Sequence, residues 1–574
     1  MRKALEKLRN RVITWDTVKL IGIVCLLAIF CIFLVGPLIL LFVKAFQDGS
    51  GAFCGLAQFR KYLSSANMLS SLGHTIYISL TATLISVSAA FAMAYSLSRR
   101  SVPCKKFFQF ISRLPMYAPT MLLGMSLIYL FGNKGILTGL GLKIPLYGKV
   151  GIIIAESIFC FPVALMILMV AFSSADNRLY EAADVLHATP FRKLITITLP
   201  SIKYGLINAV FVCFTYSFTD FGAPSVVGGN YNVLATDIYK QVIGQQNFNM
   251  GAVVGIIMML PTVLSFFVDR FTSKRQTGAI SSRSIPYRIV PNKRADIIAT
   301  CFCVLVTLFM IGFFGVSLFG SLVTFWPYNL KLTLSHYDFS LISASGGVET
   351  IFRSIKVSAL AAIIGTIIAF MAAYFVEKTQ KFKLLRRIIY ALAISPNAIP
   401  GTVIGLAYIF FFNPKTFPLF GTGYQINNSF YFLYNTVALL VCVNITHYFS
   451  VPFITASTAL KRLDNEFESV SDSLKVPFYR TLARITLPLS MQAILEIAVY
   501  FFMNSMVTVS AVIFLCTSIT QLASVVVVNV QGAGNDAAAA AICMVILAIN
   551  LIVRILYEII NKPISRKTDA WMKR

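Results

Sequence analysis

Residues 179–200 read Leu-Tyr-Glu-Ala-Ala-Asp-Val-Leu-His-Ala-Thr-Pro-Phe-Arg-Lys-Leu-Ile-Thr-Ile-Thr-Leu-Pro, and this polar stretch separates two long apolar runs. A related stretch, residues 467–488, reads Phe-Glu-Ser-Val-Ser-Asp-Ser-Leu-Lys-Val-Pro-Phe-Tyr-Arg-Thr-Leu-Ala-Arg-Ile-Thr-Leu-Pro. It also lies between two apolar runs. A polar loop that occurs twice among such runs indicates a duplicated membrane protein.

The apolar runs have the length of membrane spans. A helix of about 20 residues crosses the ~30 Å hydrocarbon layer, and only helices satisfy their own backbone hydrogen bonds within a single such segment. The sequence predicts twelve spans, at 21–43, 75–97, 111–132, 150–172, 204–226, 250–269, 298–325, 352–376, 388–412, 431–456, 490–515 and 536–558. The first run is too long for a signal peptide and is expected to be a retained anchor.

The composition excludes most soluble classes of protein. Charged residues make up 12% of the 574 residues and the mean hydropathy is +0.78, whereas soluble domains carry about 25% charged residues. Most of the eleven cysteines lie in apolar runs, no Cys-x-x-Cys occurs, and there are only four histidines. We therefore expect buried thiols, with no metal site, disulfide framework or cofactor.

The net charge of +27 is explained by topology. About 36 of the 49 Lys and Arg residues fall on the side of the N-terminus when the predicted spans are threaded, and that side is cytoplasmic by the positive-inside rule. Both termini and both polar loops are then cytoplasmic. The basic surplus does not indicate nucleic-acid binding, because no basic patch with interleaved aromatic residues occurs.

The chain is an internal duplication. Three matches pair 79–95 with 358–374, 115–124 with 396–405, and 191–200 with 479–488, at offsets of 279, 281 and 288 residues. Six spans in each half make the repeat parallel, with the transport pathway between the halves. The predicted domains are a first transmembrane domain at 1–272, a basic cytoplasmic linker at 273–297 and a second transmembrane domain at 298–574.

The first polar loop resembles the EAA loop of ABC importer permeases, Glu-Ala-Ala-x3-Gly-x12-Pro. The acid near a helix N-terminus and the helix-forming alanines predict a short helix, which ends at the turn between His187 and Pro190. His187 stands where the family usually has Gly. The predicted ATPase-coupling residues of this loop are Glu181, Ala182, Ala183, His187, Pro190 and Pro200.

The second loop is a degenerate copy of the same motif. Anchored on Pro488, the family glutamate falls on Ser469 and the glycine on Lys475, while Glu468 lies one position early. The predicted coupling residues of this loop are Glu468, Ser469, Leu474, Lys475 and Pro488.

The resemblance implies how such a permease works. In the family, each loop docks a coupling helix onto a nucleotide-binding subunit, and an external binding protein delivers the substrate. The chain has no Gly-x4-Gly-Lys-[Ser/Thr] phosphate loop, so it is expected to be a transport subunit rather than an enzyme. Two loops imply two copies of a separate ATP-binding subunit at the cytoplasmic face. The resemblance also implies that the permease itself lies in the inner or plasma membrane of a bacterium.

The substrate is predicted from a narrower resemblance. Residues 129–133, 183–200, 220–222 and 232–248 resemble permeases for 2-aminoethylphosphonate, and the wider resemblance is to fused ferric-iron permeases. An ABC importer of 2-aminoethylphosphonate or a related phosphonate is therefore expected, and an importer of ferric iron or of a different small anion is the alternative. The spans hold almost no cationic groups to bind a phosphonate, which places selectivity in the binding protein.

Polar residues inside the spans are candidates for lining the path, because charges facing lipid are costly. Asp220 and Asn504 are the predicted pathway residues, and a helix-packing role for Asp220 is the alternative. The predicted fold is all-α, with about twelve transmembrane helices in two parallel six-helix repeats, as in the type I ABC importer (MetI-like) permeases. An ion-coupled secondary transporter remains a competing class, and it would need an intramembrane cluster of ionisable residues.

Overall fold

The computed structural model describes residues 15–173, 176–279, 287–339, 347–418, 425–464, 466–474 and 476–572. Over this part of the chain, nine helices are long and apolar enough to cross a membrane. Three further pairs of helices qualify as spans interrupted by a bend, which gives up to twelve. The prediction of an all-α polytopic membrane protein with about twelve spans is confirmed.

The described chain forms two compact units, which we call the N-unit and the C-unit. The N-unit contains residues 45–347 and 526–547, and the C-unit contains residues 348–525 together with 15–44 and 548–572. The division into units therefore differs from the division into sequence repeats. The predicted linker at 273–297 is helical at both ends, because α15 extends to Ala279 and α16 begins at Lys293; residues 280–286 lie outside the described residues.

The N-unit is built mainly from the long helices α5, α9, α12, α15 and α16. Its elements in chain order are α4 (Ala57–Ser64), α5 (Ala66–Arg99), α6 (Lys105–Ser112), η2 (Leu114–Tyr117), α7 (Thr120–Phe131), α8 (Ile136–Gly139), α9 (Lys149–Ser173), α10 (Asn177–Val185), α11 (Pro190–Lys193), η3 (Leu194–Thr198), α12 (Leu199–Thr219), α13 (Gly222–Val227), α14 (Leu234–Tyr239), η4 (Lys240–Gly244), α15 (Phe248–Ala279), α16 (Lys293–Leu322), β1 (Val323–Phe325), β2 (Asn329–Leu332) and η5 (Ser335–Tyr337). Helix α9 packs along α5 and α12, so its buried apolar side chains form the centre of this core.

The C-unit repeats much of this arrangement around α17. Its elements are α2 (Trp15–Phe30), η1 (Cys31–Val35), α3 (Gly36–Ala45), α17 (Glu349–Lys378), α18 (Lys383–Ile394), η6 (Ser395–Ala398), α19 (Gly401–Phe412), β3 (Thr416–Pro418), β4 (Gln425–Asn427), η7 (Tyr431–Leu433), α20 (Val437–Tyr448), α21 (Ser450–Lys461), α22 (Glu466–Ser473), α23 (Phe478–Thr481), η8 (Leu482–Thr486), α24 (Leu487–Leu489) and α25 (Met491–Val507). Helices α26 (Ala523–Gly532) and α27 (Asp536–Met572) contribute to both units. The only strands in the described chain form two short antiparallel hairpins, β1–β2 and β3–β4.

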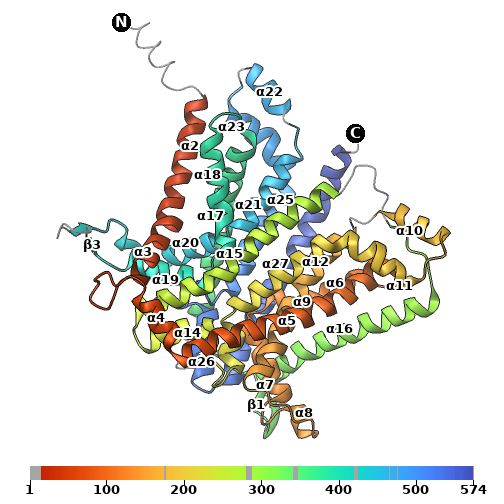
Figure 1. The fold of residues 1–574 in the computed structure, drawn as a ribbon, viewed down its shortest axis with the longest axis horizontal. Coiled ribbons are helices and arrows are strands. Elements are labelled where there is room, and N and C mark those ends of the chain that lie inside the picture. The colour runs from red at the N-terminus through yellow and green to blue at the C-terminus, as the bar shows by residue number, and fades with distance from the viewer. Residues whose placement is uncertain are drawn as a thin grey trace. The chain divides into compact units, whose positions relative to one another are not determined.

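The first helix of each repeat packs in the unit that the other repeat builds. In the C-unit, α2 lies against α17 and α18 (Figure 1), and the rings of Phe30 and Phe449 meet at 5.2 Å. In the N-unit, α16 runs beside α5, α6 and α7 (Figure 1), where the hydroxyls of Ser126 and Ser317 are 2.6 Å apart. Each core therefore needs a helix from the other sequence repeat.

Prolines interrupt the third span of each repeat. The turns η2 and η6 each carry a proline in their first turn, and Pro119 and Pro400 are the N-caps of α7 and α19. A proline removes a backbone donor and disfavours a helical residue before it. In the second repeat the two parts of this span meet at an angle of 114°.

The fifth span is more irregular than the sequence suggests. The π-turns η3 and η8 occupy equivalent positions and lead directly into the helices that carry Pro200 and Pro488. Because proline has no N–H to donate, the preceding turn widens to an i→i+5 pattern. The predicted span at 204–226 is also interrupted, because α12 ends at Thr219 and α13 begins at Gly222.

Candidate functional site

The first polar loop forms a helical hairpin from α10 and α11 that presents apolar side chains outward. Leu186 is 80% exposed and Phe191 is 70% exposed. Glu181 is also exposed, and its carboxylate accepts a 2.6 Å hydrogen bond from the Asn177 amide. Exposed apolar side chains around an acid are typical of a protein docking surface.

The turn of this hairpin explains the glycine of the family motif. His187 has a φ of +49°, in the left-handed region that glycine adopts without a steric penalty. The His187 and Ala188 amides donate to the carbonyls of Asp184 and Ala183 at 3.0 and 2.9 Å, which closes the end of α10. Thr189 then caps α11, and Pro190 occupies its first turn.

The remaining predicted residues of the loop are distributed over both faces of the hairpin. Ala182 is exposed, whereas Ala183 is buried, with 8% of its surface exposed. Pro190 and Pro200 are exposed, and Lys193 forms an ion pair with Asp184 across the hairpin. The structure therefore gives the motif one outward face and one inward face.

The inward face of the hairpin rests on Arg99, the last residue of α5. Arg99 is 4% exposed, and its guanidinium lies 4.1 Å from the ring centre of Tyr287 and 5.1 Å from that of Tyr180. It also donates to the Phe172 carbonyl at 3.1 Å and lies over that ring. The Tyr180 hydroxyl is 3.0 Å from that of Thr198, so this tyrosine joins both arms of the loop.

The second loop has the same outward chemistry. Leu474 is 70% exposed, Tyr479 is 48% exposed, and Ser469 and Pro488 are also exposed. Ser469 lies on α22, Leu474 directly follows that helix, and Tyr479 and Pro488 lie on the α23–η8–α24 segment. The predicted coupling residue Lys475 lies outside the described residues.

Glu468 does not lie on that outward face. Its carboxylate is 3.3 Å from the Lys378 ammonium, and the two side chains are 14% and 1% exposed. Lys378 is the last residue of α17 and also donates to the Leu463 carbonyl at 2.8 Å. Glu468 is therefore buried against the end of α17, as Tyr180 is against the end of α5, whereas Glu181 is exposed.

The internal repeat pairs each of these residues of the first half with a residue at the equivalent position of the second half. The 288-residue offset pairs Leu186 with Leu474, Tyr180 with Glu468 and Glu181 with Ser469, and the 279-residue offset pairs Arg99 with Lys378. Sequence reasoning did not single out Leu186, Tyr180, Arg99 or Lys378. An alignment of the two halves at offsets of 288 and 279 residues could have identified them, because each of these residues has a counterpart at the same repeat position.

The predicted pathway residue Asp220 lies at the break between α12 and α13. One of its oxygens accepts from the Thr120 hydroxyl at 2.9 Å, and the other accepts from the Ala223 amide at 2.9 Å. Gly222 permits this approach, because a Cβ there would lie 2.1 Å from the Thr120 oxygen. Glu156, a fully buried residue of α9, faces Asp220.

The second repeat builds the equivalent region without carboxylates. Asn444, also fully buried, corresponds to Glu156, and Thr508 corresponds to Asp220 and likewise caps the end of its helix. Asn504 has a different position, one turn earlier in α25, and its amide donates to the Tyr500 carbonyl at 2.8 Å. The two predicted pathway residues are therefore not counterparts in the repeat.

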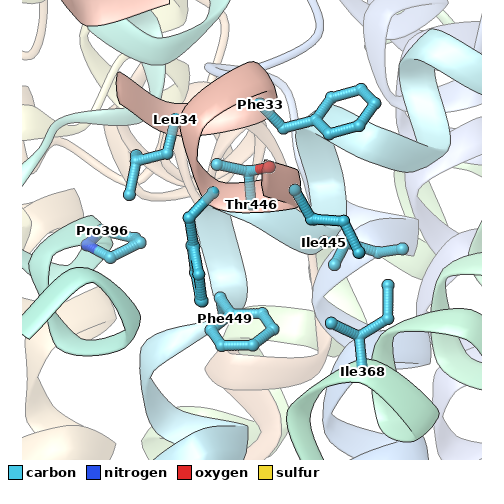
Figure 2. Close-up of a pocket in the computed structure, with 9 residues that line it drawn as sticks. Phe33, Leu34, Ile368, Pro396, Ile445, Thr446 and Phe449 are labelled. Carbon is cyan, nitrogen blue, oxygen red and sulfur yellow. The ribbon is translucent and has the colours of Figure 1, made fainter. Parts of the chain in front are cut away.

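A cavity in the C-unit is too small and apolar to be a solute site. Its volume is about 30 Å³, and Figure 2 shows apolar side chains around it, with Thr446 as the polar exception among the labelled residues. It lies where α2 and η1 pack on α20, between Phe30, Leu34 and Ile445. The described residues also contain no group of three or more metal-ligating side chains.

The chain matches the model of one protein family over most of its length. The family is described as "Binding-protein-dependent transport system inner membrane component", and it matches twice, at residues 82–278 and 365–566. The two matches correspond to the two halves of the internal repeat. Each of them includes one of the two polar loops.

Several curated proteins are similar to this chain. A putative ferric transport system permease protein of Haemophilus influenzae is 26% identical over 90% of this chain and 81% of its own length. A ferric transport system permease protein of Actinobacillus pleuropneumoniae is 25% identical over 92% of this chain and 76% of its own length. A putative 2-aminoethylphosphonate transport system permease protein of Salmonella choleraesuis is 24% identical over 43% of this chain and 88% of its own length.

Among solved structures, a bacterial ABC transporter involved in the import of the acidic polysaccharide alginate aligns with 47% of this chain and 99% of that chain. The sequence identity is 19% and the TM-score is 0.39.

Proposed function

Because the chain belongs to the family of binding-protein-dependent transport system inner membrane components, and is an all-α ABC importer permease with both halves in one polypeptide, we propose that it passes a small solute from an external binding protein to the cytoplasm. The transport steps would be driven by two copies of a separate ATP-binding subunit. The two halves would alternate between outward-facing and inward-facing arrangements.

The observation that carries this proposal is the matched pair of exposed loops. Leu186 and Leu474 occupy the same repeat position, and both are among the most exposed leucines of the described chain, at 80% and 70%. A membrane protein with exposed apolar side chains at the turns of two equivalent loops provides two equivalent docking surfaces. The sequence has no phosphate-binding loop of its own, so ATP hydrolysis is assigned to the partner subunits.

The proposed orientation places both loops and both termini in the cytoplasm. It rests on the excess of Lys and Arg on that side of the predicted spans. The membrane is then the bacterial inner or plasma membrane, and the binding protein meets the opposite face.

Two substrates are proposed, each with its own support. Ferric iron is favoured by relatives that match 90% and 92% of this chain. The original expectation of 2-aminoethylphosphonate is favoured by a relative that matches 43% of the chain. We give ferric iron at least equal weight, because its support extends over both halves. In either case we place selectivity in the binding protein and a pathway role on Asp220 and Asn504.

The deciding experiment is ATP-dependent uptake into proteoliposomes that contain the permease and its ATP-binding subunit. Labelled ferric iron and labelled 2-aminoethylphosphonate are offered in parallel, each with its cognate binding protein. Uptake that needs ATP and is lost when the ATP-binding subunit is omitted supports the proposal. Uptake driven by a proton or sodium gradient without ATP would instead establish an ion-coupled transporter.

Glu181→Lys tests the docking role of the first loop in the same assay. Glu181 is exposed on α10, so we expect the variant to insert normally and to lose uptake. Glu349→Lys is a suitable control, because Glu349 is an exposed acid at the start of α17, with 85% of its side chain exposed. Normal uptake by Glu181→Lys would contradict the docking role.

A further inference from the structure

The two loops share an inward contact that the docking proposal does not require. In each repeat, the last residue of a long helix is a buried cation, Arg99 in α5 and Lys378 in α17. Each cation contacts the loop residue at the same repeat position, Tyr180 or Glu468. We call Arg99–Tyr180 and Lys378–Glu468 the two anchor pairs.

We propose that Arg99 and Lys378 are positioning residues that fix the two docking loops to the long helices α5 and α17, so that movement of a loop is transmitted into the membrane. The inference rests on the proposed function. It also gives Glu468 a role: this residue is the counterpart of Tyr180 and holds the second loop from within, and it does not contact a partner subunit.

The two anchor pairs reach the same result by different chemistry. Arg99 is enclosed by the rings of Phe172, Tyr180 and Tyr287 at 5.4, 5.1 and 4.1 Å. A planar guanidinium suits such an aromatic environment, because it stacks and is weakly hydrated. Lys378 instead relies on an ion pair and on the Leu463 carbonyl, as a compact ammonium group does in a buried site.

The first anchor pair extends into the segment that joins the two repeats. Tyr287, which contacts both Arg99 and Tyr180, lies in that segment. The next residue, Arg288, donates its amide to the Asn177 side chain at 3.1 Å, and the same Asn177 holds Glu181. The position of the first loop is therefore linked to the connection between the halves.

A simpler explanation is that each cation only stabilises the C-terminus of its own helix, where a positive charge is favourable. The two explanations differ in what the loop partner does. If the cation serves only its helix, removing the Glu468 charge leaves the loop unchanged. If Lys378–Glu468 is an anchor, removing either partner releases the second loop, because the charge of the other partner is left buried without compensation.

The test measures trypsin cleavage at Arg480 and Arg484, two exposed sites in the second loop, in inside-out vesicles that contain the full-length permease. We expect Lys378→Met and Glu468→Gln to speed this cleavage at least about tenfold, because breaking a buried ion pair is strongly destabilising. Lys378→Arg should stay near wild type. The Lys378→Met, Glu468→Met double variant should be cleaved more slowly than either single variant, because no uncompensated charge remains.

A matched control separates this anchor from ordinary ion pairs. Lys461 pairs with Glu377 at 3.4 Å, and its side chain is 58% exposed, so Lys461→Met should leave cleavage unchanged. Should Lys378→Met insert poorly, Glu468→Gln and the double variant decide the question. The proposal would be overturned if Glu468→Gln is cleaved at the wild-type rate. It would also be overturned if the increase in cleavage rate in the double variant equals the combined increases in the two single variants.

The first anchor pair has a parallel test. Arg99→Lys keeps the charge but loses the planar stacking, so we expect faster cleavage at Arg192 and Lys193 in the first loop and no change in the second. Arg100→Lys is the control, since Arg100 is less buried and lies over a different ring, that of Tyr95. Unchanged cleavage of the first loop in Arg99→Lys would remove Arg99 from the proposal.

Uptake measured on the same variants distinguishes a failure of the anchor pairs from a failure of the docking role of the loops. Released loops with reduced ATP-dependent uptake support both the anchor pairs and the docking role. Released loops with full uptake would retain the anchors and contradict the docking role of the loops. Loops that stay protected overturn the anchors whatever the uptake.

Discussion

At the scale of single residues, the internal repeat provides a control for the interpretation of this chain. Two residues at equivalent positions of the repeat have the same place in the fold. The fold alone therefore does not require their side chains to differ in charge or polarity. Glu156 and Asn444 are both fully buried at equivalent positions, and Asp220 and Thr508 both end a helix. The carboxylates of the first half are therefore candidates for function.

Asp220→Thr tests this idea by installing the residue of the second half. We expect the variant to insert at the wild-type level, because Thr508 occupies the equivalent place. We expect uptake to fall about tenfold, the effect of losing an interaction with a charged group worth about 1.5 kcal/mol. The measurement is initial uptake rate against protein amount in the same vesicles, with Asn504→Ala in parallel. Full uptake by Asp220→Thr would leave the residue with a packing role only.

His187 offers a second test at this scale. A non-glycine residue at a φ of +49° carries a backbone cost of about 1 kcal/mol. His187→Gly should therefore retain uptake and slow trypsin cleavage at Arg192, whereas a β-branched His187→Val should speed that cleavage. Equal cleavage of the two variants would contradict a steric role for this turn.

At the scale of elements, the fold was largely predictable and the contacts within the site were not. The spans are predictable from hydropathy, and the interruption of each third span is predictable from the chemistry of its two prolines. The break at Asp220 was missed because the span was predicted from hydropathy over the whole run, although Gly222 and Pro224 follow Asp220 and both residue types commonly interrupt helices. The anchor pairs were missed because Arg99 and Lys378 lie at span ends, where basic residues usually face the headgroups, and only packing shows that both are buried.

The two exposed leucines give the prediction at this scale. Leu186→Asp and Leu474→Asp place a charge where a partner would need an apolar contact, and a buried hot-spot contact is worth about 2 kcal/mol or more. We expect each variant to weaken co-purification of the ATP-binding subunit at least about tenfold. Leu140→Asp is the control, because Leu140 is 78% exposed and lies in a different loop. Unchanged co-purification by both variants would contradict docking at these tips.

At the scale of the whole molecule, the exchange of first helices makes the two halves interdependent. The N-unit contains α16 from the second repeat, and the C-unit contains α2 from the first. Neither repeat expressed alone has all the helices of a unit. The sequence repeat defines two domains of similar length, but it could not show that their first helices are exchanged, because hydropathy records that a helix spans the membrane and not what it packs against.

Separate expression of the halves tests this interdependence. Residues 1–279 and 287–574 can be produced as two chains, which divides the protein between α15 and α16. We expect each chain alone to be degraded, and co-expression to restore both to near wild-type levels with ATP-dependent uptake. Protease resistance and yield of each chain, alone and together, are the measurements. Two halves that are stable alone would argue against the exchange.

The exchange also has a consequence for biosynthesis. Helix α2 is synthesised before its packing partners, which begin about 300 residues later, in α17. At a synthesis rate of about 5–20 residues per second, this helix waits roughly 15–60 s in the bilayer before a partner exists. During that interval its apolar surface must be shielded by lipid or by the insertion machinery, so errors in assembly should begin with this helix.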